Sequence, residues 1–198
     1  MEIEIANPFR EVTNGKSNHA KQAKIIKWNF PIAGTWKFNT DGSSRGNPGP
    51  GGIGGILRDD NGVWECGFTG SLDHCSSIFA ELSSINYALK LILKKSYKNV
   101  LIETDSQIAV NMITEEKPTT WCIRDENDPL NILINECKSL LRMTRSNICH
   151  VYREGNFCAD FLAKEGVNQS TECLILDQPP SELLPFLLAD LMGITYIR

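Results

Sequence analysis

The fold is decided by the stretch Trp36-Lys-Phe-Asn-Thr-Asp-Gly-Ser-Ser-Arg-Gly-Asn-Pro-Gly-Pro-Gly-Gly52. It begins as a short apolar run that ends at Asp41, and Gly42 then opens a glycine- and proline-rich segment that turns the chain. Two further apolar runs, separated by Asn-Gly, follow at Ile53–Arg58 and Val63–Thr69. This pattern predicts three sequential antiparallel strands.

Helical and strand-like segments alternate after these runs. Leu82, Ile85, Leu89 and Ile92 recur at spacings of three and four residues, which predicts a helix. That helix should end near Lys94-Lys95. Strands are expected over residues 99–105 and 146–153, and helices around residues 108–113, 130–143 and 157–167. Such an order indicates an α/β sheet covered by helices. The crossover helix predicts parallel pairing between the first strand and the one that ends at residue 105.

Length and composition indicate one compact domain. The chain has 198 residues, of which 41% are hydrophobic and 22% charged. We expect an N-terminal linker or tail over residues 1–33, a domain over 34–170, and a tail over 171–198 with a short docked helix. The net charge of -4 gives no strongly basic surface of the kind that many nucleic-acid binders use.

The seven cysteines are scattered and form no C-x-x-C pair, so they indicate neither a zinc site nor a redox motif. They are typical of reduced thiols. We therefore expect an intracellular protein, in the nucleus or the cytoplasm, that is neither secreted nor inserted in a membrane.

Two acidic residues stand where strands are expected to end. Asp41 and Asp105 each close an apolar run, and ligands of α/β sheets bind outside the carboxyl ends of the strands. If the two strands are parallel neighbours, the carboxylates lie side by side and repel each other unless a cation lies between them. Hard oxygen ligands of this kind suit Mg²⁺ or Mn²⁺.

Two more acids fall near helix starts. Glu81 is expected in the first turn of the long helix, and Asp160 one turn into the helix that follows Asn156. Each could simply be favoured there by the helix dipole. A capping box for Glu81 is disfavoured by Ile78, which stands where Ser or Thr would be needed.

Four motifs in order carry a family resemblance. They are Asn39-Thr-Asp-Gly-Ser-Ser-Arg-Gly-Asn-Pro-Gly-Pro-Gly-Gly52, Ala80-Glu-Leu82, Glu103-Thr-Asp-Ser-Gln107 and Arg153-Glu-Gly-Asn-Phe-Cys-Ala-Asp-Phe-Leu-Ala163. Together they resemble the motifs of type 1 ribonuclease H. The chain is most similar to the ribonuclease H-like domains of plant non-LTR retrotransposons and related stand-alone genes. The resemblance runs from about Trp28 to Val167, and the Pro-Pro tail is similar as well.

The resemblance implies a fold, a reaction and a set of site residues. The fold would be a five-stranded mixed sheet, three strands antiparallel and two parallel, with helices on both faces. Asp41, Glu81, Asp105 and Asp160 would hold two Mg²⁺ ions, with Mn²⁺ as a substitute. The reaction would be endonucleolytic hydrolysis of the RNA strand of RNA:DNA hybrids. The chain would be a monomer that works with an associated or fused reverse transcriptase.

The glycine-rich loop has two interpretations, a turn between strands or a close approach to a nucleic-acid backbone. The family's contacts to the minor groove of the hybrid carry over to a small set of positions. The residues expected to bind substrate are Gly42, Ser44, Asn47, Ser77 and Gln107.

Some positions depart from the family pattern. Ser77 and Ile78 stand where many members have a pair of asparagines. Residues 117–129 hold three acids where many members have a lysine-rich helix and loop that bind the DNA strand. Fewer phosphate contacts predict weaker and less salt-sensitive binding. A catalytically weak or inactive module that binds nucleic acid or protein is therefore the alternative, and another nuclease on this fold is a third.

Histidine and tryptophan side chains are less informative. His150 is ten residues before Asp160, as a catalytic histidine of the family would be, but its apolar neighbours favour a place within a strand. His74 is expected in a loop. Packing is the favoured role of all four tryptophans, namely Trp28, Trp36, Trp64 and Trp121.

Overall fold

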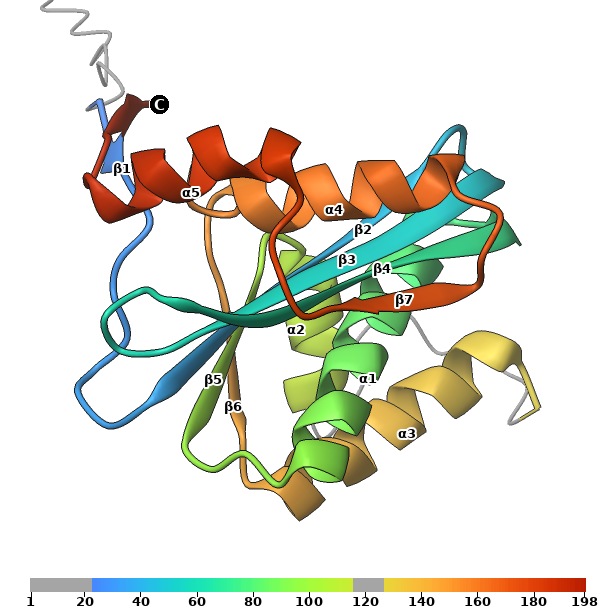
Figure 1. The fold of residues 1–198 in the computed structure, drawn as a ribbon. Helices are drawn as coiled ribbons and strands as arrows, with labels where there is room; N and C mark the ends of the chain where they lie inside the picture. Colours follow the sequence, from blue (N-terminus) through green and yellow to red (C-terminus); the bar gives the residue numbers. More distant parts are fainter. Residues whose placement is uncertain (1–22, 116–126) are drawn as a thin grey trace, which may run out of the picture.

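A computed structural model describes residues 23–115 and 127–198 of the chain. Its centre is a mixed sheet of six strands in the order β6-β5-β2-β3-β4-β7 (Figure 1). The strands β2 (Trp36–Ser44), β3 (Gly49–Arg58) and β4 (Trp64–Cys75) pair antiparallel, as their apolar runs predicted. Because β2 extends to Ser44 and β3 starts at Gly49, much of the glycine-rich stretch is strand and only its middle is a turn.

The parallel half of the sheet is formed by β5 (Val100–Thr104) and β6 (Asn147–His150). β5 pairs parallel with β2 on one side and with β6 on the other. The register places Thr40 opposite Thr104, so the next residue of each strand lies at the same level. The predicted parallel pairing is confirmed.

Two features of the sheet differ from the expected five strands. β7 (Cys173–Leu176) pairs antiparallel with β4 and adds a sixth strand, since it satisfies the backbone groups along the edge of β4. A separate two-residue pair joins β1 (Ile25–Ile26) to β8 (Tyr196–Ile197). Residues of the expected tail therefore pair with the domain through β7, and Trp28 of the expected linker donates a hydrogen bond to Asn39 of β2. The boundaries at residues 33 and 170 stay a prediction.

Helices cover both faces of the sheet, as expected (Figure 1). One face is covered by α1 (Ser77–Lys95), α2 (Gln107–Thr114) and α3 (Pro129–Thr144). The other face carries α4 (Phe157–Asn168) and α5 (Leu184–Leu191). Short 3-10 turns, Arg153–Gly155 and Ser181–Leu183, precede these last two helices.

The main core lies between the sheet and α1, where the four apolar residues that predicted the helix are fully buried. A smaller core packs β3 against α4 and the C-terminal segment. Its buried members are Ile56, Cys158, Leu162, Leu183 and Leu187. α4 approaches the sheet closely because β3 is rich in glycine: a Cβ on Gly54 would lie 2.2 Å from the Ala163 nitrogen. Within the described residues, no helix has the length and apolar character needed to cross a membrane.

Candidate active site

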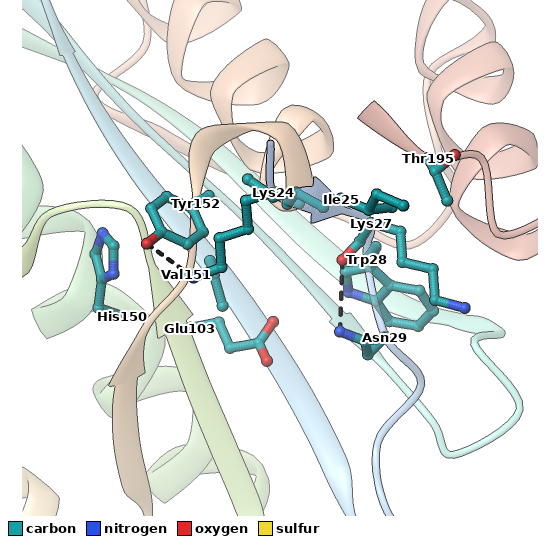
Figure 2. A pocket seen from close by; sticks show the side chains of 12 residues that line it. Lys24, Ile25, Lys27, Trp28, Asn29, Glu103, His150, Val151, Tyr152 and Thr195 are labelled. Atoms are coloured by element: carbon teal, nitrogen blue, oxygen red, sulfur yellow. Dashed lines mark hydrogen bonds between the residues drawn. The ribbon is translucent and has the colours of Figure 1, made fainter. Parts of the chain in front are cut away.

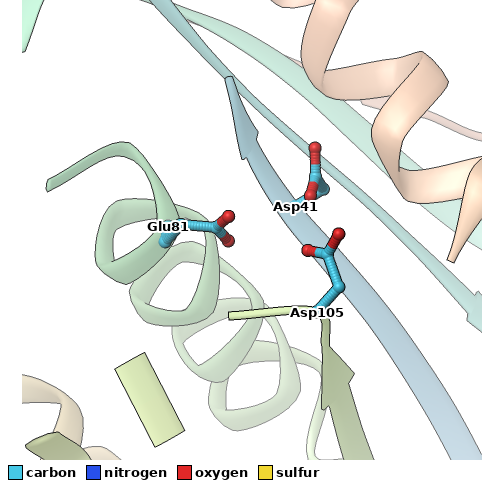
Figure 3. A group of neighbouring side chains, drawn as sticks. All are labelled: Asp41, Glu81 and Asp105. Atoms are coloured by element: carbon cyan, nitrogen blue, oxygen red, sulfur yellow. The ribbon is translucent and has the colours of Figure 1, made fainter. Parts of the chain in front are cut away.

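Three carboxylates from separate elements lie close together near the C-terminal ends of the parallel strands β2 and β5. Asp41 lies in β2, Glu81 in α1, and Asp105 directly after β5, and one carboxylate oxygen of each lies within 4.8 Å of the others (Figure 3). The parallel register brings Asp41 and Asp105 together, as the sequence predicted. Asp41 lies inside its strand, however, because β2 continues to Ser44 beyond the expected end.

Glu81 reaches the cluster because α1 lies very close to β2. A Cβ built on Gly42 would stand 2.2 Å from both the Ala80 carbonyl carbon and the Glu81 nitrogen, so a side chain cannot fit there. The Gly42 N–H donates to Glu81 Oε2 at 3.3 Å, and the Thr104 hydroxyl donates to the same oxygen at 3.4 Å. Glu81 lies beyond the expected first turn, since α1 begins at Ser77. The helix dipole acts mainly on the first turn, so it does not account for an acid at position 81.

Burial and mutual repulsion dominate the electrostatics of this cluster. Burial, followed by repulsion from Glu81 and Asp105, raises the pKa of Asp41 well above its usual range. Burial and repulsion from Asp105 raise the pKa of Glu81 to about 8, although the Gly42 N–H and the Thr104 hydroxyl act in the opposite direction. These hard oxygen donors, crowded together, fit a divalent cation such as Mg²⁺ or Mn²⁺.

Without metal, the free energy of unfolding should fall as the pH rises from about 5 to above 8. Below pH 4.5 the Glu81 carboxyl is protonated in both states. Between 4.5 and about 8 the folded state holds a proton that the unfolded state has lost, so stability is lost as the pH rises through the folded pKa. Each pKa unit corresponds to about 1.4 kcal/mol, which makes the loss easy to detect. Urea denaturation in EDTA across this range measures it.

Glu81→Gln is the matched control for that experiment, because it removes one titrating group and should make the profile shallower, with the remaining slope due to the raised pKa of Asp41. Mg²⁺ should raise the melting temperature more at pH 8 than at pH 5, since a cation binds the ionised carboxylates. A metal-free stability that rises between these pH values would contradict the raised pKa of Glu81.

Asp160, the fourth predicted acid, is not part of the three-carboxylate group. It lies in the first turn of α4, where Arg153 Nη2 binds one of its oxygens and Lys164 Nζ lies 2.5 Å from the other. Asp160 is nevertheless near the cluster, since its charge is among the causes that raise the pKa of Asp41. The structure thus places Asp160 beside the site with its carboxylate already paired.

Some of the predicted substrate-binding residues adjoin the acids. Asn47 and Ser77 line a cavity of about 430 Å³ together with Glu81. The Asn47 Oδ1 accepts a hydrogen bond from the Ser77 backbone N–H at 3.0 Å. Ser44 Oγ donates to the Gly46 and Cys75 carbonyl oxygens, and Gln107 Nε2 donates to Asn111 Oδ1 at 2.8 Å. Whether these four residues and Gly42 contact substrate stays a prediction.

The histidines and tryptophans follow the packing interpretation where they are described. His150 is the last residue of β6, and its ring packs edge-on against Tyr152 at 5.5 Å between centroids. His74 lies exposed in β4, which corrects its expected place in a loop. Trp28 is buried. Trp121 and most of the acidic stretch 117–129 lie outside the described residues.

One buried polar cluster was missed by sequence reasoning. Lys37 and Asn39 are buried on the strand that carries Asp41, and Glu103 is buried two residues before Asp105. The sequence held a signal for the β2 part of this cluster but not for its distant partners, because Lys37, Asn39 and Asp41 alternate along β2 and must share one face of the sheet. A strand face that is polar throughout but buried indicates a specific hydrogen-bond network.

Comparisons with known proteins agree with this geometry. Residues 39–166 match the reverse transcriptase-like family. A protein of Arabidopsis thaliana that is named after ribonuclease H is 36% identical over 88% of the chain, which spans only 27% of that protein. Ribonuclease H of Rickettsia akari is 34% identical over 68% of the chain and 92% of its own length. The crystal structure of RNase H1 from Halobacterium salinarum superposes with a TM-score of 0.60 at 28% identity, over 68% of the chain and 98% of that structure.

The chain therefore belongs to the reverse transcriptase-like family. Within that family it is of the ribonuclease H type, like these bacterial, archaeal and plant relatives.

Proposed function

We propose that the chain is an endonuclease that hydrolyses the RNA strand of RNA:DNA hybrids with two Mg²⁺ ions, which Mn²⁺ can replace. The observation that carries this proposal is the convergence of Asp41, Glu81 and Asp105 within 4.8 Å. The relatives named as ribonucleases H support the same substrate. Carboxylates crowded together in this way, with Asp41 buried and the other two partly buried, repel one another when ionised, and bound cations would relieve that repulsion.

Asp41, Glu81 and Asp105 would hold the cations, and Asp160 would join them. Bound Mg²⁺ would lower the pKa of a water molecule and stabilise negative charge on the phosphate oxygens. The protein's own part is to fix the ligands. The Gly42 N–H and the Thr104 hydroxyl orient Glu81, β2 holds Asp41 within the strand, and the end of β5 holds Asp105.

Positive charge beside the acids suits a phosphodiester substrate. Arg153 and Lys164, whose side chains are 57% and 54% exposed, hold Asp160 at the rim of the site. We propose that Asn47 and Ser77, together with Ser44, Gln107 and the Gly42 backbone, face the minor groove of the hybrid. Ribose 2′-hydroxyls exposed in that groove distinguish RNA from DNA.

The proposal extends to the setting of the reaction. The hybrid would be supplied by an associated or fused reverse transcriptase, and the chain would act as a monomer inside the cell, in the nucleus or the cytoplasm. The six described cysteines are free thiols, which supports a reducing compartment.

The testing experiment is cleavage of an end-labelled RNA:DNA hybrid with Mg²⁺. We expect 5′-phosphorylated RNA fragments, no product from single-stranded RNA or duplex DNA, and complete loss of cleavage in EDTA. If no hybrid is cut at any Mg²⁺ or Mn²⁺ concentration, the nuclease proposal is wrong.

One observation favours the alternative of a catalytically weak or inactive binding module. Both carboxylate oxygens of Asp160 are in ion pairs, with Arg153 and Lys164, instead of being free to bind a cation. Its signature would be saturable binding of the hybrid without any product.

A further inference from the structure

Asn39 is fully buried and every hydrogen-bonding group of its side chain is used. Its Nδ2 donates to Glu103 Oε2 at 3.0 Å and to Asn156 Oδ1 at 3.2 Å. Its Oδ1 accepts from Trp28 Nε1 at 3.0 Å and from Arg58 Nη2 at 2.8 Å. Reversing the amide would aim its NH₂ at two groups that can only donate. An asparagine in this one orientation therefore satisfies four partners at once.

The first contact, from Asn39 to Glu103, ties β2 to β5, the strand that leads to Asp105. Asn39 is two residues before Asp41, and Glu103 is two residues before Asp105. The other carboxylate oxygen of Glu103, Oε1, forms an ion pair with Lys37 Nζ at 2.7 Å. The two side chains are nearly buried, with 9% of Glu103 and 4% of Lys37 exposed. The side chain of Asn39 thus reaches, through a fixed carboxylate, the strand that positions the second aspartate.

The second contact ties β2 to α4. Asn156 immediately precedes that helix, and its Nδ2 donates to the Thr40 carbonyl oxygen at 3.0 Å, next to Asp41 in the chain. The Asn156 side chain makes no capping bond to its own helix. It instead fixes the helix that carries Asp160 against the strand that carries Asp41.

The third and fourth contacts bring in both ends of the described chain. Arg58 forms a buried ion pair with Asp190 of α5 at 2.7 Å, and its guanidinium lies 3.7 Å from the centroid of the Trp28 ring. Trp28 and Asp190 both lie outside residues 39–166, the part that matches the family. The orientation of Asn39 is therefore held by segments beyond the matched region.

Water has access close to this network. Trp28 and Glu103 line a cavity of about 480 Å³ between the N-terminal segment and the edge formed by β5 and β6 (Figure 2). A truncated side chain at position 39 can be replaced there by solvent. Replacements of similar size test the role of Asn39 more sharply than alanine does.

We propose that Asn39 is a positioning residue that sets the relative placement of Asp41, Asp105 and Asp160, and through it the affinity of the site for divalent cations. The catalytic readout of this inference rests on the proposed function, whereas the cation-binding readout does not. Residues that orient metal ligands without touching the metal change its affinity by about tenfold or more when they are replaced.

The experiment measures Mn²⁺ affinity from the free Mn²⁺ signal in electron paramagnetic resonance, for the unmutated chain and two variants. Asn39→Leu keeps the branched shape of the side chain, with a somewhat larger volume, and removes all four hydrogen bonds. Asn39→Asp keeps the two accepted bonds but faces Glu103 with a second carboxylate. We expect both to weaken Mn²⁺ binding by about tenfold. For Asn39→Asp, the expected weakening is opposite to the effect of charge alone, because an added negative charge near the site would strengthen cation binding.

Leu140→Ala is the control for general loss of stability. Leu140 is buried in α3, which carries none of the four acids. This variant should lower the melting temperature and leave Mn²⁺ affinity unchanged. In the cleavage assay, the Asn39 variants should need about tenfold more Mg²⁺ for half-maximal rate, with the KM for hybrid unchanged.

Unchanged Mn²⁺ affinity in a folded Asn39 variant would overturn the inference and leave Asn39 a purely structural residue. The Asp variant decides the question if the Leu variant does not fold. If the unmutated chain binds Mn²⁺ but cuts no hybrid, the proposed function fails while the comparison of affinities still tests Asn39.

Discussion

We expect Asp105→Asn to lower the rate of the proposed hybrid cleavage by about a thousandfold at saturating Mg²⁺, because several kcal/mol of charge stabilisation would depend on the ligands of the cations. Asp105 is only partly buried, directly after β5, so the amide can take its place without disturbing the core. The measurement is the initial rate on an end-labelled hybrid, with circular dichroism melting to show that the fold persists.

Glu136→Gln is the matched control, since it makes the same chemical change on α3, away from the site. Glu136 pairs with Lys90 at 2.9 Å and its side chain is 43% exposed, so its loss should leave the rate within about twofold. A rate for Asp105→Asn close to that of the unmutated chain would remove Asp105 from the catalytic set.

Gly42→Ala should lower the free energy of unfolding by about 3 kcal/mol or more, and with it the activity. The added methyl group would meet the backbone of α1 at 2.2 Å, at Ala80 and Glu81, and backbone cannot rotate away as a side chain can. The helix must therefore move from the strand, which also displaces Glu81 from Asp41. Urea denaturation gives the loss of stability.

Gly155→Ala is the comparison for this variant, because its Cβ would lie 3.3 Å from the Lys27 carbonyl oxygen, a contact that a small shift relieves. We expect it to cost about 1 kcal/mol or less. If Gly42→Ala is as stable as Gly155→Ala, the close packing of α1 on β2 is not what requires glycine, and a role of Gly42 at the substrate becomes the better explanation.

Local patterns predicted the elements and the central pair of acids. The spacing of Leu82, Ile85 and Leu89 is set by one helix and its one buried face, so it can be read without knowing the rest of the chain. The pairing of Asp41 with Asp105 needed one further rule, that a helical crossover joins parallel strands. The helix is confirmed as α1, and the pairing of the aspartates is confirmed by the parallel register of β2 and β5 and by the distance between the two carboxylates.

Features that depend on distant partners could not be predicted in the same way. β7 is a run of four residues that becomes a strand because the edge of β4 is available, and the pattern of those residues does not reveal that edge. The pairing of Asp160 with Arg153 and Lys164 depends on side-chain conformations. The network around Asn39 joins segments far apart in the chain, which no window of sequence contains.

The buried pair of Arg58 and Asp190 couples two positions that are 132 residues apart. A substitution that neutralises only one of them leaves the other charge buried without a partner, which should lower the free energy of unfolding by several kcal/mol. Replacing both by apolar side chains of similar size can leave that free energy nearly unchanged. Single substitutions at either position should therefore be far more costly than a matched change at both. The choice of residue at position 190 in α5 thus depends on the residue at position 58 in β3.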